Sequence, residues 1–306
     1  MSTPESREPE APVLHHVRLN DCELAYYERA PELRGKGPTL FFVHATGFHA
    51  RVWDQIIARL PRHHSIALDQ RGHGRSEDKA ISHWRTVGED QVALIESLDL
   101  QDIVGIGHSM GAHAMIEAAA TCQQRFRRLV LIDPTVMAPG DYIREEDAPR
   151  AGEARMHPAA KRRNRFDSVE AMMERLQNRS SFHLFDPQMF RDYCEYALRP
   201  AADGDGFELS CPPEVEASVY MTGRTNGGIY DSVHALEIPV LVLRAMPPTD
   251  DMVGPQIFSA SPTWPGLAAE FRDAREIYYP DKSHFLPMEI PDEVAGLIRT
   301  EIEATS

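Results

Sequence analysis

The sequence predicts an α/β fold: a mostly parallel sheet with helices on both faces, interrupted by a long insertion. Three observations support this prediction. Short apolar runs of strand length alternate with amphipathic stretches of helical period, as in parallel strands joined by helices. The alternation stops at residues 136–236, where the chain is polar and helix-rich. A length of 306 residues suffices for one large domain with an insertion.

The first part of the predicted core occupies residues 12–135. A polar tail, residues 1–11, precedes it and is expected to be disordered. Two strand-like runs, residues 13–20 and 23–28, are separated by an Asn-Asp pair that suits a hairpin turn. The next runs are solidly apolar, which is typical of strands in the middle of a parallel sheet. They lie at residues 39–43, 64–68, 102–108 and 128–132.

Helices are predicted between these strands, and the sheet resumes after the insertion. Apolar residues recur at helical spacing, and Pro61 closes the first such stretch. These helices are expected at residues 51–60, 84–98 and 112–120. The core then continues over residues 237–306, with strands at 239–243 and 275–279 and a final amphipathic helix at 292–303.

One turn in this pattern has a chemical explanation. Gly107-His108-Ser109-Met110-Gly111 joins a buried strand directly to a helix. A nucleophilic serine must hold its hydroxyl clear of the backbone, and a sharp strand-to-helix turn does this. Such a turn crowds both flanking positions, where Gly107 and Gly111 have no side chain to clash. We therefore predict that Ser109 is a nucleophile; an ordinary turn with a capping serine is the alternative.

A nucleophilic serine needs a base, and His284 is the candidate. It follows the last predicted strand and precedes the final helix. Because parallel strands all end on one side of a sheet, the loop of His284 is expected at the same edge as Ser109. A surface-loop histidine is the alternative interpretation.

Three aspartates are candidates for the acid that orients the base. Asp250 follows the strand at 239–243 and is the leading candidate. Asp133 follows the strand at 128–132 and is the alternative, while Asp251 stands directly beside Asp250. Both strand ends lie at the edge where His284 is expected, so either position suits its far ring nitrogen. Each aspartate also suits a turn or a helix cap.

The carbonyl oxygen under attack becomes negatively charged and needs backbone N–H donors. One donor is expected from Met110, the residue after the predicted nucleophile. The second is expected from Thr46, in the loop that follows the strand at 39–43. His44, at the start of this loop, is expected to brace it rather than to act as a base.

No cofactor or metal ion is predicted. Gly105 and Gly107 begin a pattern similar to a dinucleotide-binding loop, but the third glycine, Gly111, comes one position too late. The adjacent histidines at 15–16 and 63–64 would point to opposite faces of a strand, which makes each pair a poor chelate.

Charge and composition exclude other classes of function. The net charge of −15 opposes nonspecific binding to nucleic acid or to an anionic membrane. We see no signal peptide and no apolar run that could cross a bilayer, so a cytoplasmic protein without a stable membrane anchor is expected. The sequence is compatible with a homodimer. The cysteines are far apart and are expected to be unpaired thiols: Cys22, Cys122, Cys194 and Cys211.

Taken together, these motifs resemble the α/β-hydrolase superfamily. The serine, the acid and the histidine follow in that family's order. Two features depart from its pattern: Ala45 replaces the usual glycine, and the loop after Leu243 lacks the usual Gly-x-x-Asp. The matching segments are His44-Ala45-Thr46-Gly47 with Trp53, Asp69-Gln70-Arg71-Gly72-His73-Gly74-Arg75-Ser76, the Ser109 turn, and Ser283-His284-Phe285 with Pro287-Met288-Glu289.

The resemblance implies an eight-stranded sheet and a capped, esterase-like member with a serine nucleophile. Such a protein would hydrolyse a carboxylic ester through an acyl-enzyme without a cofactor. The same residues would also suit a lactone or carbon–carbon bond hydrolase, or a perhydrolase. A non-catalytic ligand-binding protein and a non-hydrolytic transferase on this scaffold are further alternatives. The serine argues against dehalogenase or epoxide hydrolase activity, since similar enzymes have aspartate there.

The insertion at residues 136–236 is expected to form a mostly helical cap. Methionine and aromatic residues are dense in this otherwise polar segment. We expect some of them to shape a pocket for a small or medium-sized hydrophobic acyl substrate. The alternative is that they only attach the cap to the sheet. The residues are Met172, Met173, Leu176, Phe182, Phe185, Met189, Phe190, Tyr193 and Tyr196.

Overall fold

The main sheet of the computed structural model has the eight strands that the sequence predicts, in the order β1-β2-β4-β3-β5-β6-β10-β11. β1 and β2 form the expected antiparallel hairpin, β2 pairs antiparallel with β4, and the other neighbours are parallel. The strands are β1 (Val13–Leu19), β2 (Cys22–Arg29), β3 (Thr39–Val43), β4 (Ser65–Asp69), β5 (Ile103–His108), β6 (Phe126–Ile132), β10 (Val240–Arg244) and β11 (Ala274–Tyr278).

The structure describes residues 11–147, 155–179, 181–250, 252 and 258–304. The tail expected to be disordered, residues 1–11, therefore lies outside the described residues except for Ala11. Within the described part, no helix has both the length and the apolar composition needed to cross a bilayer. The four cysteines are buried free thiols, as predicted.

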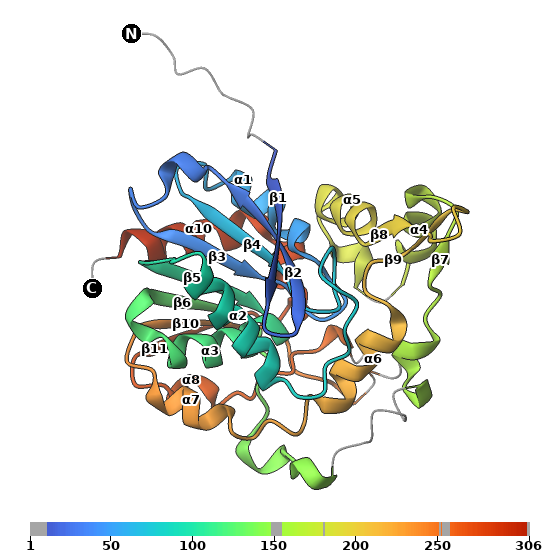
Figure 1. Cartoon of the computed structure of the whole chain (residues 1–306). Coiled ribbons are helices and arrows are strands. Elements are labelled where there is room, and N and C mark those ends of the chain that lie inside the picture. Colours follow the sequence, from blue (N-terminus) through green and yellow to red (C-terminus); the bar gives the residue numbers. More distant parts are fainter. Residues whose placement is uncertain (1–10, 148–154, 180, 251, 253–257, 305–306) are drawn as a thin grey trace.

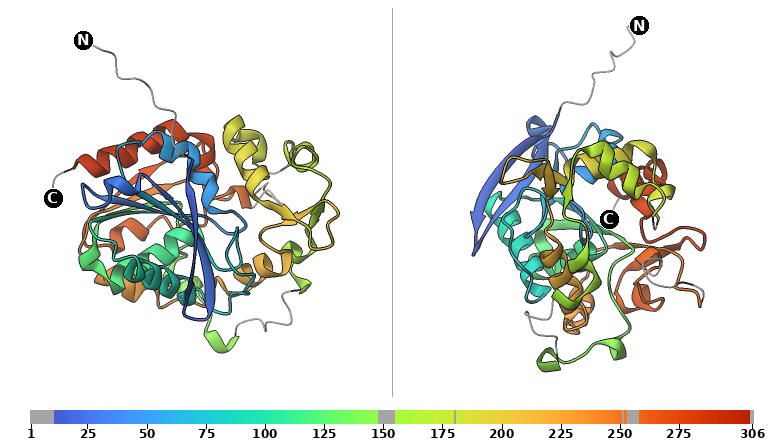
Figure 2. Two further views of the ribbon diagram at one scale, coloured as in Figure 1. Left: turned by 45° about the horizontal axis from the view of Figure 1, so that its top comes forward. Right: turned by 90° about the vertical axis from the view of Figure 1, so that its right-hand side faces the viewer.

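Helices cover both faces of the sheet because its central strands are apolar on both sides. In β3, Leu40 and Phe42 enter one hydrophobic cluster while Phe41 and Val43 enter another, as the alternation of a strand requires. The two faces and their helices are visible in Figures 1 and 2. The first cluster contains residues of α1 (Asp54–Ala58) and α10 (Pro291–Glu303), and the second those of α2 (Arg85–Ser97), α3 (Met110–Thr121), α7 (Ile229–Ala235) and α8 (Leu267–Glu270).

The insertion contains helices and also a small sheet that the sequence did not predict. Its helices are α4 (Val169–Leu176), α5 (Pro187–Tyr196), α6 (Pro213–Thr222) and, at its end, α7. The Ser168 and Asp186 side chains cap the first turns of α4 and α5. Three antiparallel strands in the order β7-β9-β8 complete the insertion: β7 (Arg165–Phe166), β8 (Leu198–Pro200) and β9 (Phe207–Leu209).

Short helices connect the larger elements. The turn η2 (Ala50–Trp53) leads into α1, and α9 (Leu286–Glu289) leads into α10. The other 3-10 helices of the described part are η1 (Pro31–Leu33), η3 (Gln123–Arg125), η4 (Pro139–Asp141), η5 (Glu145–Asp147), η7 (Pro158–Lys161) and η8 (Phe182–Leu184).

The part of the insertion that contains α4, α5, α6 and the small sheet lies to one side of the main sheet, at the right in Figure 1, and shares its hydrophobic core. Met189 and Tyr193 of α5 belong to the same buried cluster as Trp53 of η2 and Leu286 of α9. The last helix of the predicted insertion, α7, packs on α3 of the core. Because this apolar cluster is continuous, part of the insertion is held by the hydrophobic packing that also stabilises the sheet.

Candidate active site

Ser109 occupies the sharp turn between β5 and α3 that the sequence predicts. Its backbone is strained, with φ 57° and ψ −120°. A Cβ atom at Gly107 would lie 2.5 Å from the Cα of Ala112, and one at Gly111 would lie 2.5 Å from the carbonyl oxygen of His44. Both positions therefore need glycine, and Gly111 brings the start of α3 against the loop after β3.

Ser109, His284 and Asp133 form a continuous hydrogen-bonded row at the carboxyl edge of the sheet. Ser109 Oγ lies 2.9 Å from His284 Nε2, and His284 Nδ1 lies 2.6 Å from Asp133 Oδ2. Relative exposure is 6% for Ser109, 9% for His284 and 0% for Asp133. The carboxylate is therefore stabilised by protein donors and not by water.

The structure brings together two predicted residues, Ser109 and His284, with the second candidate for the acid. The prediction that Asp250 would contact His284 was wrong, because Asp133 binds the Nδ1 atom. Asp250 is exposed, in a turn that follows Pro247 and Pro248. Asp251 lies outside the described residues.

Three donors from two segments hold the Asp133 carboxylate in place. Oδ1 accepts hydrogen bonds from the Ala245 N–H at 2.9 Å, the Ser261 hydroxyl at 2.6 Å and the Thr263 hydroxyl at 3.2 Å. Oδ2 remains available for the histidine. Ala245, the residue after β10, thus supplies a backbone donor for the acid that follows β6, the neighbouring strand in the sheet.

The backbone of His284 is fixed from two sides. Its N–H donates to the Ser259 carbonyl at 2.8 Å, and its carbonyl accepts from His108 Nε2 at 2.8 Å. Burial, with a smaller effect of His284, keeps the pKa of His108 well below its ordinary value. His108 is therefore neutral at pH 7, with its proton on the nitrogen that donates to the His284 carbonyl.

The backbone N–H groups of Met110 and Thr46 have no hydrogen-bond acceptor among the described residues. The Met110 N–H lies in the first turn of α3, where no intrahelical acceptor exists. In the loop after β3, the Gly47 N–H donates to His73 Nε2 at 3.0 Å and the Phe48 N–H to the Ala45 carbonyl at 3.1 Å. The Thr46 N–H makes neither kind of contact, and Thr46 is one of the two residues predicted as oxyanion donors.

His44 braces this loop, as the sequence predicts. Its Nδ1 donates to the Ala45 carbonyl at 2.7 Å, and its Nε2 accepts from the Gln70 N–H at 3.1 Å. Burial lowers the pKa of His44 well below the ordinary value. One ring nitrogen can therefore donate while the other accepts.

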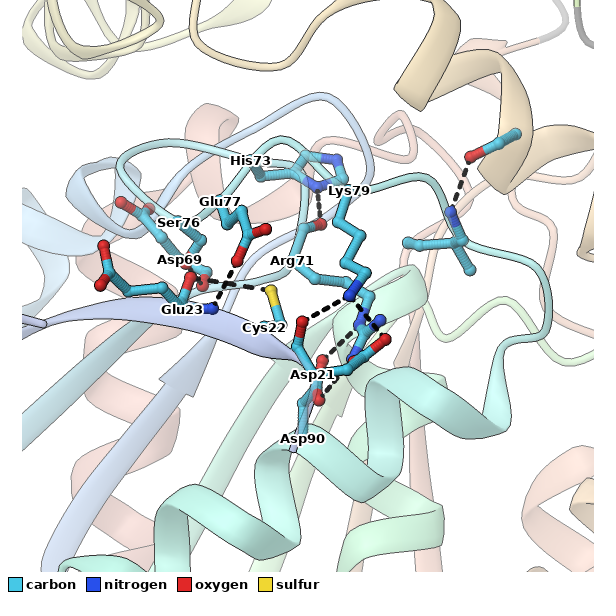
Figure 3. Close-up of polar contacts among 12 residues, drawn as sticks. Asp21, Cys22, Glu23, Asp69, Arg71, His73, Ser76, Glu77, Lys79 and Asp90 are labelled. Atoms are coloured by element: carbon cyan, nitrogen blue, oxygen red, sulfur yellow. Dashed lines mark hydrogen bonds and ion pairs between the residues drawn. The ribbon is translucent and has the colours of Figure 1, made fainter. Parts of the chain in front are cut away.

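The loop from Asp69 to Ser76 ties the same region to α2 (Figure 3). Arg71 donates to both carboxylate oxygens of Asp90, at 2.5 and 2.7 Å, and to Asp21 at 3.1 Å. His73 Nδ1 lies 2.9 Å from the Arg71 carbonyl, so that Nε2 can accept the Gly47 N–H. A buried ion pair thus supports the orientation of the histidine that holds the loop after β3.

Some residues at the site carried no recognisable sequence signal. Thr135 Oγ1 lies 3.1 Å from Ser109 Oγ, and Ser261 and Thr263 bind Asp133. Serine and threonine are common in loops, and the sequence does not show which of them fold back onto an acid. Only the approximate position of Thr135, just beyond a predicted strand, could have drawn attention to it.

Aromatic side chains of the insertion lie beside the His284 loop. Phe285 lies 5.7 Å from Phe48 and 5.6 Å from Phe185 between ring centroids, and Phe48 lies 4.8 Å from Tyr193. The other predicted cap residues divide by burial. Met172, Met189 and Phe190 are buried in the shared core, Met173, Leu176 and Phe182 are partly buried against it, and Tyr196 packs on Arg51.

Within the described residues, no three His, Cys, Asp or Glu side chains gather as a metal site would require. The arrangement itself comprises a hydroxyl, an imidazole that bridges the hydroxyl and a buried carboxylate, and the Met110 and Thr46 N–H groups.

Residues 40–297 match the model of a family described as "Alpha/beta hydrolase family". A 2-(acetamidomethylene)succinate hydrolase of Mesorhizobium japonicum is 33% identical over 142 residues, which are 46% of this chain and 49% of that protein. The chain therefore spans about half the length of this relative.

Two further comparisons extend over most of the chain. Lipase LipV of Mycobacterium tuberculosis is 27% identical over 264 residues, covering 85% of this chain and 91% of that protein. The crystal structure of E-2-(acetamidomethylene)succinate hydrolase superimposes with a TM-score of 0.73 and 23% identity, covering 96% of this chain and 100% of the other. The structural likeness supports the same fold.

Proposed function

The chain belongs to the alpha/beta hydrolase family, and we propose that it is a serine hydrolase that cleaves a small or medium-sized hydrophobic carboxylic ester. The observation that carries the proposal is the row Ser109–His284–Asp133, with 2.9 Å between hydroxyl and imidazole and 2.6 Å between imidazole and carboxylate. These distances are those of a nucleophile, a general base and the acid that orients the base.

In the proposed mechanism, Ser109 Oγ attacks the ester carbonyl and His284 Nε2 accepts its proton. Asp133 accepts the Nδ1–H, which keeps the proton-free nitrogen of the neutral imidazole towards the serine. The Met110 and Thr46 N–H groups stabilise the oxyanion. His284 then protonates the leaving alcohol, and water attacks the acyl-enzyme by the same route in reverse. No cofactor takes part.

The hydrophobic character of the substrate is inferred from the rings beside the histidine. Phe285 lies 5.4 Å from His284 between ring centroids, and Phe48 and Phe185 pack on Phe285 at 5.7 and 5.6 Å. Aromatic side chains give apolar contact area at small entropic cost. One relative is named as a lipase and another as a hydrolase of 2-(acetamidomethylene)succinate. Both names support hydrolysis of a carboxylic acid derivative.

Labelling with a fluorophosphonate probe, combined with a panel of 4-nitrophenyl esters, tests the proposal. The wild-type protein should be labelled and should turn over, while Ser109→Ala should retain the fold and lose both properties. Ser97→Ala is the matched control, because Ser97 lies at the end of α2 and bonds the Leu94 carbonyl. Full labelling of Ser109→Ala, or ligand binding by an unlabelled wild type without turnover, would reject the proposed function.

A further inference from the structure

An ion pair of the insertion lies against the loop that contains Thr46. Arg162 follows η7 and donates through Nη1 to Glu216 Oε2 of α6. A Cβ atom at Gly47 would lie 3.0 Å from Glu216 Oε1 and 3.4 Å from Arg162 Nη1. The pair therefore contacts the residue next to the amide that we assign to the oxyanion.

The two partners differ in how much of each is accessible. The Glu216 side chain is 6% exposed, whereas 31% of the Arg162 side chain is accessible. Glu216 engages Nη1, and the Tyr193 hydroxyl also contacts the guanidinium. A guanidinium carries five N–H donors, so these two partners use only part of it. The remaining donors have no further partner among the described residues.

The charge of Arg162 is secure in this environment. Burial lowers the pKa of its guanidinium, but the Glu216 carboxylate and the Tyr193 hydroxyl raise it more, so that it stays above its ordinary value. Glu216 also limits the movement of the guanidinium. A cation that is fixed and partly accessible is suited to bind a planar anion without a large loss of side-chain entropy.

We propose that Arg162 binds a carboxylate on the substrate, so that the preferred substrates are hydrophobic esters with a carboxylate a few bonds from the scissile carbonyl. This inference rests on the proposed function, because it places the ester carbonyl at Thr46 and Met110. A monoanion fits better than a dianionic phosphate, since the nearby Glu216 carboxylate would repel the second charge.

Two esters with the same acyl length test the inference: mono(4-nitrophenyl) glutarate and 4-nitrophenyl pentanoate. The wild type should prefer the glutarate. Arg162→Gln should lower kcat/KM for the glutarate by about 10- to 100-fold, the range expected for a hydrogen bond between charged groups, and change the pentanoate by less than about threefold. Arg163→Gln is the control, because Arg163 is an exposed neighbour of equal charge. It should leave the preference intact.

The variant Arg162→Gln leaves the buried Glu216 carboxylate without its partner. An unpaired buried charge can be strongly destabilising. The double variant Arg162→Gln/Glu216→Gln removes both charges, and its thermal melting curve shows whether it is folded. It should lose the same preference for the glutarate. An equal loss on both esters would make Arg162 an anchor of the insertion and overturn the inference, as would a wild type without any preference.

Binding separates this inference from the proposed function. Calorimetry with monomethyl glutarate and Ser109→Ala should give an affinity that Arg162→Gln weakens about tenfold or more. Unchanged affinity would overturn the role of Arg162 whether or not the protein turns over esters. If the protein is labelled by the fluorophosphonate probe and turns over both esters equally well, this inference alone is rejected. If Arg162 binds the carboxylate but the protein is neither labelled nor active on esters, only the proposed function is rejected.

Discussion

The carboxyl edge of the main sheet and the insertion hold their side chains by different means. At the sheet edge, Ser109 and Asp133 stand directly after β5 and β6, and His284 stands on the loop after β11. Backbone groups hold the His284 main chain, and the Ala245 N–H, together with nearby hydroxyls, holds the Asp133 carboxylate. In the insertion, contacts near the site are made between side chains, such as Phe185 with Phe285 and Arg162 with Glu216. The first arrangement follows from sheet geometry, and the second depends on packing between distant segments.

This difference separates the two parts of the proposed activity. The attack on the carbonyl needs atoms placed to within a fraction of an ångström, and strand ends in a rigid sheet provide that placement. Substrate preference depends on what the insertion presents to the site. Changes at the sheet edge should therefore affect every substrate, whereas changes in the insertion should affect some substrates more than others.

The largest expected effect comes from the two aspartates. Asp133→Asn should lower kcat by about 10⁴-fold for every ester, because the amide no longer fixes the imidazole in the tautomer with a free Nε2. Asp250→Asn should stay close to wild type, since this side chain is exposed. Steady-state kinetics on one chromogenic ester decides between them. If Asp250→Asn loses most of its kcat while Asp133→Asn keeps it, the assignment of Asp133 as the acid is wrong.

The sequence could name both aspartates but could not choose between them. β6 and β10 are neighbours in the sheet, so an acid after either strand begins at the same edge. The choice depends on long-range contacts: Ser261 and Thr263 fold back onto Asp133, and Ala245 donates its N–H. Ser109 and His284 were predictable because one has a local turn motif and the other a place after the last strand.

A second prediction concerns the close approach between α3 and the loop after β3. Gly111→Ala should destabilise the protein by about 3 kcal/mol, because the new Cβ meets the backbone oxygens of His44 and Val43 at 2.5 and 2.6 Å. It should also lower activity on all esters, since the loop carries the Thr46 amide. Urea unfolding and kcat measure the two effects.

Gly37→Ala is the control for Gly111→Ala, because a Cβ at Gly37 would meet no atom within 4 Å. It should be nearly neutral in both measurements. Equal stability of Gly111→Ala and Gly37→Ala would show that the loop after β3 can move away from α3. The sheet edge would then not be the rigid part of the molecule.

The main sheet could be predicted from the sequence, whereas the small sheet of the insertion could not. The strands of the main sheet were predictable because buried parallel strands are continuous apolar runs, such as residues 39–43. The insertion's sheet was not, because β7 has two residues while β8 and β9 have three, and β8 ends in a proline. Such short segments have no measurable period, and their pairing is determined by the tertiary structure around them.

A third prediction tests whether the core and the insertion unfold together, because His113 joins the two. This side chain of α3 bonds the Thr135 carbonyl at 2.8 Å and, at 2.9 Å, Asn226, which stands just after α6 of the insertion. Burial lowers the pKa of His113 from 6.5 to about 4. The unfolded chain therefore binds a proton below pH 6.5 and the folded chain only below about 4. Stability should fall by up to about 3 kcal/mol as the pH drops through this window.

Comparison with His113→Gln isolates this contribution from other buried groups. Asp69, whose pKa is raised to about 6 by burial, gives an opposite slope that both proteins share. The difference in unfolding free energy between wild type and variant should therefore shrink from pH 7 to pH 4.5. A single transition by circular dichroism and tryptophan fluorescence is expected throughout. A difference that stays constant with pH would contradict the role of His113.

The smallest effect is expected where the insertion meets the His284 loop, and it tests whether the insertion determines substrate preference. Phe185→Leu removes a ring that lies 5.6 Å from Phe285, so the ratio of kcat/KM between hexanoate and acetate 4-nitrophenyl esters should change by about tenfold. Phe190→Leu is the matched control. Phe190 is buried in the same cluster, and its described ring contacts are with Phe182 and Phe185. It should cost about the same stability and leave the ratio unchanged. If both variants lower the two activities in proportion, the rings only anchor the insertion, and substrate preference is determined at the sheet edge after all.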